Sequence, residues 1–182
     1  MTNNKKPTDT ENKTPWLELG EQREDVFIKE VAPKLQLEAE QNPRKKDDPT
    51  AIDMIVNGAP ADLKTQETPF FTSGKTYDLP PQYTVTFNKN DHQRYKTKEN
   101  VELYFWVRWR DETEGYGVEV DEMEGVWKID HSTVTRWIAE GDTPLHQYRR
   151  RQGDTENARS SYLLDLREME HLGYFVEPGV DK

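Results

Sequence analysis

Hydrophobic residues recur with two different periods along the first quarter of the chain. In residues 20–31 they fall three or four positions apart, which predicts a helix, and acidic residues at its start suit the positive end of the helix dipole. Pro33 ends this helix because it lacks the backbone N–H that a helix requires. In residues 35–40 apolar and polar residues alternate, which predicts a strand.

Two more strands are predicted on either side of the dipeptide Asn57-Gly58. Residues 51–56 form an apolar run, and Asn-Gly is typical of the tight turn that joins two antiparallel strands. Asp53 lies in the first of these strands, and Asp62 and Lys64 lie in the second. Side chains two positions apart on a strand share a face. The hairpin can therefore bring Asp53 and Asp62 together, with a lysine beside them.

Two carboxylates in that position repel each other unless a proton or a cation lies between them. Hard oxygen ligands of this kind suit Mg²⁺ or Mn²⁺. The alternative is a solvated hairpin that carries an exposed ion pair, worth about 0–1 kcal/mol and without chemistry.

Later stretches continue the mixture of strand and helix patterns. The run at 101–109 is the most apolar of the chain and predicts a buried central strand. Ser132 is expected to cap a helix that Gly141 ends. The other predicted elements are a strand at 83–87, a short helix at 91–98, a hairpin of residues 114–120 and 125–129, and helices at 133–140 and 155–171.

Composition favours one domain with loose ends. The 182 residues include five Trp, eight Tyr and six Phe, which can build a core although only 32% of the residues are hydrophobic. Polar composition predicts disorder in residues 1–15 and in the tail 179–182. We expect a single domain at 16–178, with its core at about 20–109 and a hairpin and helices at about 114–175.

Several common classes of protein are excluded by missing motifs. The chain has no cysteine, so it has neither disulfides nor thiolate metal sites, and its four histidines lack zinc-binding spacing. Phosphate-binding loops, dinucleotide-binding motifs and the serine-hydrolase motif are also missing from the sequence. No apolar stretch approaches the length of a membrane span and no signal-peptide pattern follows Met1, so we expect a cytoplasmic protein without a membrane partner.

The acid Asp53, followed by the triplet Asp62-Leu63-Lys64, resembles the signature of the PD-(D/E)XK nuclease superfamily, which includes many restriction endonucleases and Holliday-junction resolvases. The predicted order of helix and strands over residues 20–109 also resembles that family's core. The resemblance implies an α/β (α+β) fold with a restriction-endonuclease-like core and a mixed central sheet flanked by helices. In this chain we expect a C-terminal helical extension to follow that core.

The same resemblance implies a metal-dependent endonuclease that hydrolyses phosphodiester bonds in DNA. Asp53, Asp62 and the backbone carbonyl of Leu63 would hold Mg²⁺ or Mn²⁺. Lys64 would orient the attacking water or stabilise charge on the phosphate.

Two further positions follow from the resemblance. Many members carry a metal-site acid on the first helix, and Glu24 is expected in that role, with Glu30 as its substitute. Gln66 matches a polar position two residues after the lysine.

A net charge of −10 opposes binding to a phosphate backbone. Two basic clusters could still grip phosphates, although such runs are usually solvated surface: Arg44, Lys45 and Lys46, and Arg149, Arg150 and Arg151. DNA is the expected partner, with a homodimer left open. Two other functions also stay open: a non-catalytic DNA-binding or protein-interaction module on the same fold, and an acidic, DNA-mimicking inhibitor of a mobile element.

Overall fold

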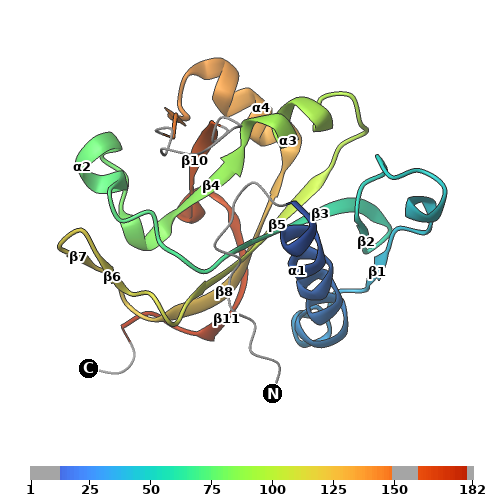
Figure 1. Ribbon diagram of the computed structural model, residues 1–182, viewed down its shortest axis with the longest axis horizontal. Coiled ribbons are helices and arrows are strands. Elements are labelled where there is room, and N and C mark those ends of the chain that lie inside the picture. Colours follow the sequence, from blue (N-terminus) through green and yellow to red (C-terminus); the bar gives the residue numbers. More distant parts are fainter. Residues whose placement is uncertain (1–12, 149–159, 180–182) are drawn as a thin grey trace.

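The computed structural model describes residues 13–148 and 160–179, which form a mixed α/β fold around a six-stranded sheet (Figure 1). In spatial order, this sheet comprises β1 (Ala39–Gln41), β2 (Met54–Val56), β3 (Ala59–Gln66), β5 (Glu102–Trp109), β8 (Met123–Asp130) and β11 (Glu170–Val176). A smaller sheet comprises β4 (Thr84–Asn88), β10 (Ser161–Asp165) and β9 (Leu145–His146), with β10 in the middle, while β6 (Glu114–Gly115) and β7 (Val118–Glu119) form a separate hairpin.

Helices cover both faces of the main sheet. They are α1 (Lys13–Val26), which continues into the π-helical turn η1 (Phe27–Val31), α2 (Ser73–Tyr77), α3 (Lys89–Tyr95) and α4 (His131–Glu140). Short 3₁₀ turns lie at Pro33–Leu35, Pro43–Lys46, Pro81–Tyr83 and Leu166–Glu168. None of the described helices is both long and apolar enough to cross a membrane.

Strand directions in the main sheet are mixed. β1, β2 and β3 form an antiparallel meander, β3 and β5 run parallel, and β8 is antiparallel to both β5 and β11. Parallel neighbours need a long crossover. The crossover from β3 to β5 carries α2, β4 and α3 and so brings α3 over the sheet.

The central strand β5 is buried on both faces. On one face, Tyr104 and Trp106 pack against Phe27 of η1, with ring centroids 6.0 and 6.3 Å away. Burial of a side chain like Phe27 contributes about 1.5–3 kcal/mol. On the other face, Leu103, Phe105, Val107 and Trp109 join a core that includes Phe87 of β4, Tyr95 of α3 and Val134 of α4. This two-sided burial confirms the predicted central strand.

The predicted hairpin around Asn57-Gly58 is also confirmed. Asn57 and Gly58 have φ angles of 49° and 80°, as a tight turn of this type requires. Val56 pairs with Ala59, and Met54 pairs with Ala61. Asp53 directly precedes β2 instead of lying within it.

Near the N-terminus the helix is longer than predicted and the first strand is shorter. α1 begins at Lys13, inside the predicted tail, whereas residues 1–12 lie outside the described residues. The strand predicted at 35–40 is confirmed only at its end, because Pro33–Leu35 forms a 3₁₀ turn and Gln36 adopts a left-handed φ of 58°. The strand therefore starts only at Ala39.

The predicted C-terminal helix at 155–171 is wrong wherever the structure describes it. Residues 161–176 form β10, a 3₁₀ turn and β11. The apolar stripe of this segment fits a helix, but pairing of β10 with β4 and of β11 with β8 overrides that local preference. In place of the expected C-terminal helical extension, this part of the chain adds strands to both sheets. Among residues 114–148 and 160–179, α4 is the one α-helix.

The hairpin predicted from residues 114–120 and 125–129 is also wrong, because β6 pairs with β7 and β8 pairs with β5 and β11. α4 begins at His131 after Asp130, one residue before the expected cap Ser132, and Gly141 ends it with a φ of 78°. α3 lies at Lys89–Tyr95, so it begins two residues earlier and ends three residues earlier than predicted.

Candidate active site

Asp62 and Lys64 project together from β3 toward α3, as their spacing of two predicts. Asp62 is 2% exposed, and its Oδ2 lies 2.7 Å from Lys64 Nζ. The two side chains share the core face on which Leu103 and Phe105, their partners on β5, are buried. A charged pair is thus fixed inside a largely apolar layer.

Three residues of α3 complete this charged group. Lys64 Nζ lies 2.5 Å from Asp91 Oδ2, and the Tyr95 hydroxyl donates to Asp62 Oδ2. Arg94 Nη2 donates to the Tyr95 hydroxyl at 2.8 Å. The sequence did not predict a role for these helix residues. They lie 27 to 33 positions from Asp62 and Lys64, and only the folded crossover brings α3 beside β3.

The contacts set the protonation of Lys64 and Tyr95. Burial alone would lower the pKa of Lys64, but the carboxylates of Asp62 and Asp91 raise it, so the ammonium stays charged. Burial and the neighbouring Asp62 raise the pKa of Tyr95, so its hydroxyl keeps its proton.

Asp53 lies next to Asp62 by the register of the hairpin. The ladder ends at the pair Met54 and Ala61, so Asp53 and Asp62 occupy the next positions of their chains. Asn42 fixes this end of the strand, because its backbone N–H donates to the Asp53 carbonyl at 3.0 Å. The 3₁₀ turn after Asn42 brings Lys45 Nζ to 2.5 Å from Asp53 Oδ1.

Glu24 of α1 reaches the same place. Its side chain hydrogen-bonds to that of Asp53, and burial, Asp53 and Asp62 raise its pKa to about 7, although Lys45 opposes the shift. Arg23 fixes the helix beside β3, because Nη1 donates to Thr65 Oγ1 at 3.1 Å. Glu30, the substitute for Glu24, lies exposed in η1.

Glu24, Asp53 and Asp62 thus converge from α1, from the residue before β2 and from β3. Among residues 13–148 and 160–179, no three His, Asp or Glu side chains already form a metal-ligand cluster, and lysines lie against both aspartates. Burial and the neighbouring Asp53 and Asp62 raise the pKa of Glu24, and a divalent cation would relieve the repulsion among these carboxylates as a proton does. Their oxygen atoms are of the type that Mg²⁺ and Mn²⁺ prefer, although such an ion would have to displace Lys45 from Asp53.

Leu63 lies on β3 between Asp62 and Lys64. Pairing between β2 and β3 ends at Ala61, so beyond that residue β3 pairs only with β5, and Leu63 pairs there with Tyr104. The side chain of Leu63 packs on the opposite face, in the core beneath α1.

Gln66 lies away from the carboxylates. Its Nε2 donates to the Thr86 carbonyl at 2.6 Å, and its Oε1 accepts from the Thr86 N–H at 3.3 Å. These bonds join β3 of the main sheet to β4 of the smaller sheet. The structure therefore gives Gln66 a bridging role between the two sheets.

The basic residues divide into three groups. Lys45 is paired with Asp53, which differs from the phosphate-contacting role expected for it, whereas Arg44 and Lys46 are exposed. The predicted contacts Arg149, Arg150 and Arg151 lie outside the described residues.

A buried histidine pair lies behind Tyr95. His92 Nδ1 and His131 Nε2 are 2.9 Å apart, and the ring of His131 is 5.6 Å from that of Tyr95. Burial and the neighbouring His92 lower the pKa of His131 to about 4, so the pair is neutral at pH 7. These histidines, far apart in the sequence, support the position of α3.

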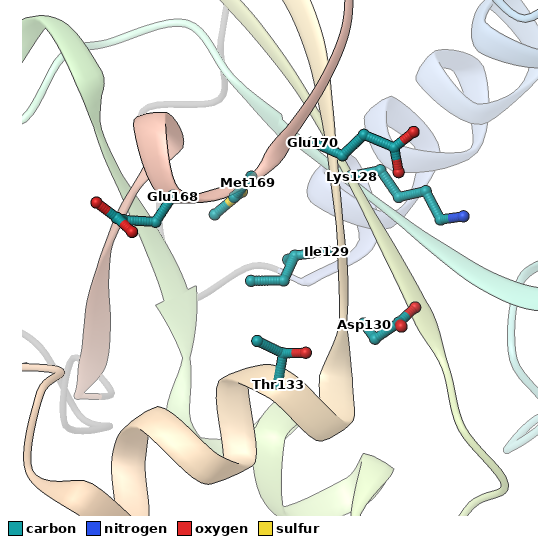
Figure 2. Close-up of a pocket in the computed structure, with 7 residues that line it drawn as sticks. All are labelled: Lys128, Ile129, Asp130, Thr133, Glu168, Met169 and Glu170. Atoms are coloured by element: carbon teal, nitrogen blue, oxygen red, sulfur yellow. The ribbon is translucent and has the colours of Figure 1, made fainter.

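Two cavities lie on the surface, and Asn42 and Ile52 of the first are neighbours of Asp53. One, of about 270 Å³, is lined by Asn42, Arg44, Asp48, Ala51, Ile52, Pro60, Thr97, Lys98 and Glu99. The other, of about 230 Å³, is lined by Lys128, Ile129, Asp130, Thr133, Glu168, Met169 and Glu170. Figure 2 shows Lys128, Asp130 and Glu170 on one side of this cavity and the apolar Ile129 and Met169 on the other. Neither cavity includes the converging carboxylates.

Comparison with known proteins does not place the chain in a family. No protein-family model, curated protein or solved structure matches it. The chemistry of the site therefore rests on its own residues.

Proposed function

We propose that the protein is a Mg²⁺- or Mn²⁺-dependent nuclease that hydrolyses phosphodiester bonds in DNA. The observation that carries this proposal is the convergence of Glu24 with Asp53 and Asp62, with Lys64 held against Asp62. The order of elements from α1 through β1, β2 and β3 to β5 also agrees with the core implied by the PD-(D/E)XK resemblance. A restriction-endonuclease-like core, DNA as the partner and a cytoplasmic location belong to the same proposal.

Each residue has a defined part. Asp53 and Asp62 supply carboxylate oxygens, Leu63 supplies its carbonyl, and Glu24 joins them after losing its proton. A bound divalent ion supplies Lewis acidity that polarises the phosphate and lowers the pKa of water. Lys64 keeps its proton and stabilises the negative charge that develops on the phosphate.

Lys45 supplies positive charge beside Asp53 when no cation is bound. Asp53, Glu24 and Glu21 raise the pKa of Lys45 against the lowering effect of burial, so its ammonium stays charged beside Asp53. Entry of a divalent ion requires Lys45 to leave Asp53. The turn that carries it lies on the surface, with exposed Arg44 and Lys46 on either side, so this movement displaces no core side chain.

A labelled DNA duplex and a labelled single strand, each with Mg²⁺, Mn²⁺, Ca²⁺ or EDTA, test the proposal. We expect cleavage with Mg²⁺ or Mn²⁺, none with EDTA, and inhibition by Ca²⁺, whose looser coordination supports binding without efficient turnover. Asp62→Asn should be inactive, and Asp130→Asn, which removes an acid from the cavity in Figure 2, should cleave like wild type. Cleavage that survives EDTA, or that Asp62→Asn retains, would contradict the proposal.

A non-catalytic interaction module is the second candidate. The net charge of −10 and the lysine partners of both aspartates favour it, because a charge-balanced site needs no cation to fold. An interaction module that recognises DNA should bind it in Ca²⁺ without cleaving it in Mg²⁺ or Mn²⁺. A module that recognises another protein should neither bind nor cleave DNA.

A further inference from the structure

We propose that Asp91 and Tyr95 of α3 are positioning residues for the reaction: Tyr95 orients the Asp62 carboxylate, and Asp91 holds Lys64 in place. This inference rests on the proposed nuclease function. Asp91 and Tyr95 are four residues apart and so share one face of α3, the face that contacts β3.

Tyr95 fixes which oxygen of Asp62 is turned toward the site. Arg94 can only donate, so its bond to the Tyr95 oxygen leaves the single hydroxyl proton for Asp62. Tyr95 and Lys64 both bind Oδ2 of Asp62. Neither contact uses Oδ1 of Asp62, which would therefore be available to a divalent cation.

The ring of Tyr95 cannot easily move. It is 1% exposed, stacks on Phe87 with centroids 6.3 Å apart, and meets the ring of His131 at 5.6 Å. A hydroxyl on a ring held in this way acts as a fixed donor, and fixed partners of this kind orient metal-binding carboxylates.

Asp91 gives Lys64 a second anchor. Lys64 Nζ lies 2.7 Å from Asp62 and 2.5 Å from Asp91, over the rings of Phe87 and Tyr95 at 5.8 and 5.7 Å. A cation at Asp62 would weaken the attraction of that carboxylate for Lys64, and the contact with Asp91 would remain. Asp91 would thus hold the ammonium in place through Lys64.

Four variants separate positioning from general support of the fold. Asp91→Asn removes the charge, Asp91→Glu restores it on a longer side chain, and Tyr95→Phe removes only the hydroxyl. Gln93→Ala changes an exposed residue of the same helix and is the matched control. The measurements are kcat and KM for a DNA duplex with Mg²⁺, the dissociation constant for Mn²⁺ by calorimetry, and the melting temperature of each protein.

We expect Asp91→Asn to lower kcat about 10- to 100-fold with KM changed less than about twofold, and Asp91→Glu to recover most of that loss. Tyr95→Phe should weaken Mn²⁺ binding about tenfold. Gln93→Ala should match wild type in every measurement.

Wild-type protein that cleaves DNA and binds Mn²⁺, with Asp91→Asn and Tyr95→Phe indistinguishable from Gln93→Ala, would overturn the inference and leave the proposed function standing. A loss in Asp91→Asn that Asp91→Glu does not relieve would also overturn it. Wild-type protein that neither binds Mn²⁺ nor cleaves DNA would overturn both proposals.

Discussion

Acidic residues gather in two regions of the molecule, and the two groups behave differently. Glu24, Asp53 and Asp62 interact with one another in a partly buried site, where burial and the two aspartates raise the pKa of Glu24 to about 7. Around the cavity in Figure 2, Glu168 and Glu170 are exposed, and the lysine there, Lys128, is paired with Glu102 at 3.0 Å. The first group thus combines burial with close contact between carboxyl groups, whereas Glu168 and Glu170 are exposed to solvent. This difference in burial, more than a hollow in the surface, favours the first group as the proposed site.

The largest expected effect separates the two groups by activity. Asp53→Asn should reduce cleavage to the background of the assay, because it removes a charged ligand from the site. Glu170→Gln in the cavity of Figure 2 should cleave at the wild-type rate. The initial rate of cleavage of a labelled duplex in Mg²⁺ is measured for each variant. Equal losses of rate in the two variants would contradict the different roles given to the two groups of acids.

The two lysines provide the next comparison. Lys64→Gln should lower kcat about 100- to 1,000-fold, the usual effect of removing a donor that stabilises charge in the transition state. Lys128→Gln should leave kcat unchanged, since Lys128 pairs with Glu102 away from the carboxylate site. Single-turnover rates at saturating DNA are the measurement; a Lys64→Gln variant at full rate would leave the lysine without a chemical role.

A smaller effect is expected in DNA affinity. Arg44 and Lys46 are exposed beside the turn that carries Lys45, so the double variant Arg44→Gln/Lys46→Gln should flatten the plot of log K against log salt by about two units. Anisotropy titrations in Ca²⁺ at several salt concentrations give this slope. An unchanged slope would assign both residues to solvated surface.

The smallest expected effect concerns stability against pH without metal. The folded pKa of Glu24, about 7, lies above its ordinary 4.5, so its contribution is fully present below pH 4.5 and is lost as pH rises through 7. Partial exposure reduces the roughly 3 kcal/mol of a full shift to about 1–2 kcal/mol. Urea unfolding at pH 5 and pH 8 should show this loss in wild type and not in Glu24→Gln. Parallel pH dependence in the two proteins would contradict the cause assigned to the pKa.

The sequence predicted the part of the site that lies on one hairpin. The alternation around Asn57-Gly58 fixes the β2–β3 hairpin, and with it the neighbouring positions of Asp53 and Asp62. Dense aromatic and branched residues likewise identified β5 as the central strand. The hairpin could be predicted because its contacts join residues near in sequence, and β5 could be predicted because its own composition is typical of a buried strand.

Contacts between distant segments could not be predicted in this way. Tyr95 and Asp62 are separated by 33 positions, and only the crossover through β4 brings them together. Lys45 was expected to contact phosphate, but folding places it against Asp53. Residues 155–171 have an apolar stripe that suits a helix, but pairing with β4 and β8 puts residues 161–165 and 170–171 in strands.

The most direct test of the metal site is a calorimetric titration of the wild-type protein with Mn²⁺ at pH 7, repeated in buffers of different ionisation enthalpy. We expect saturable binding that releases about half a proton, because Glu24 has a pKa of about 7 and must ionise to join Asp53 and Asp62 at the ion. Asp62→Asn should lose the binding, and Glu24→Gln should lose the proton release. The absence of Mn²⁺ binding, or binding that Asp62→Asn retains in full, would contradict the assignment of Glu24, Asp53 and Asp62 as a metal centre.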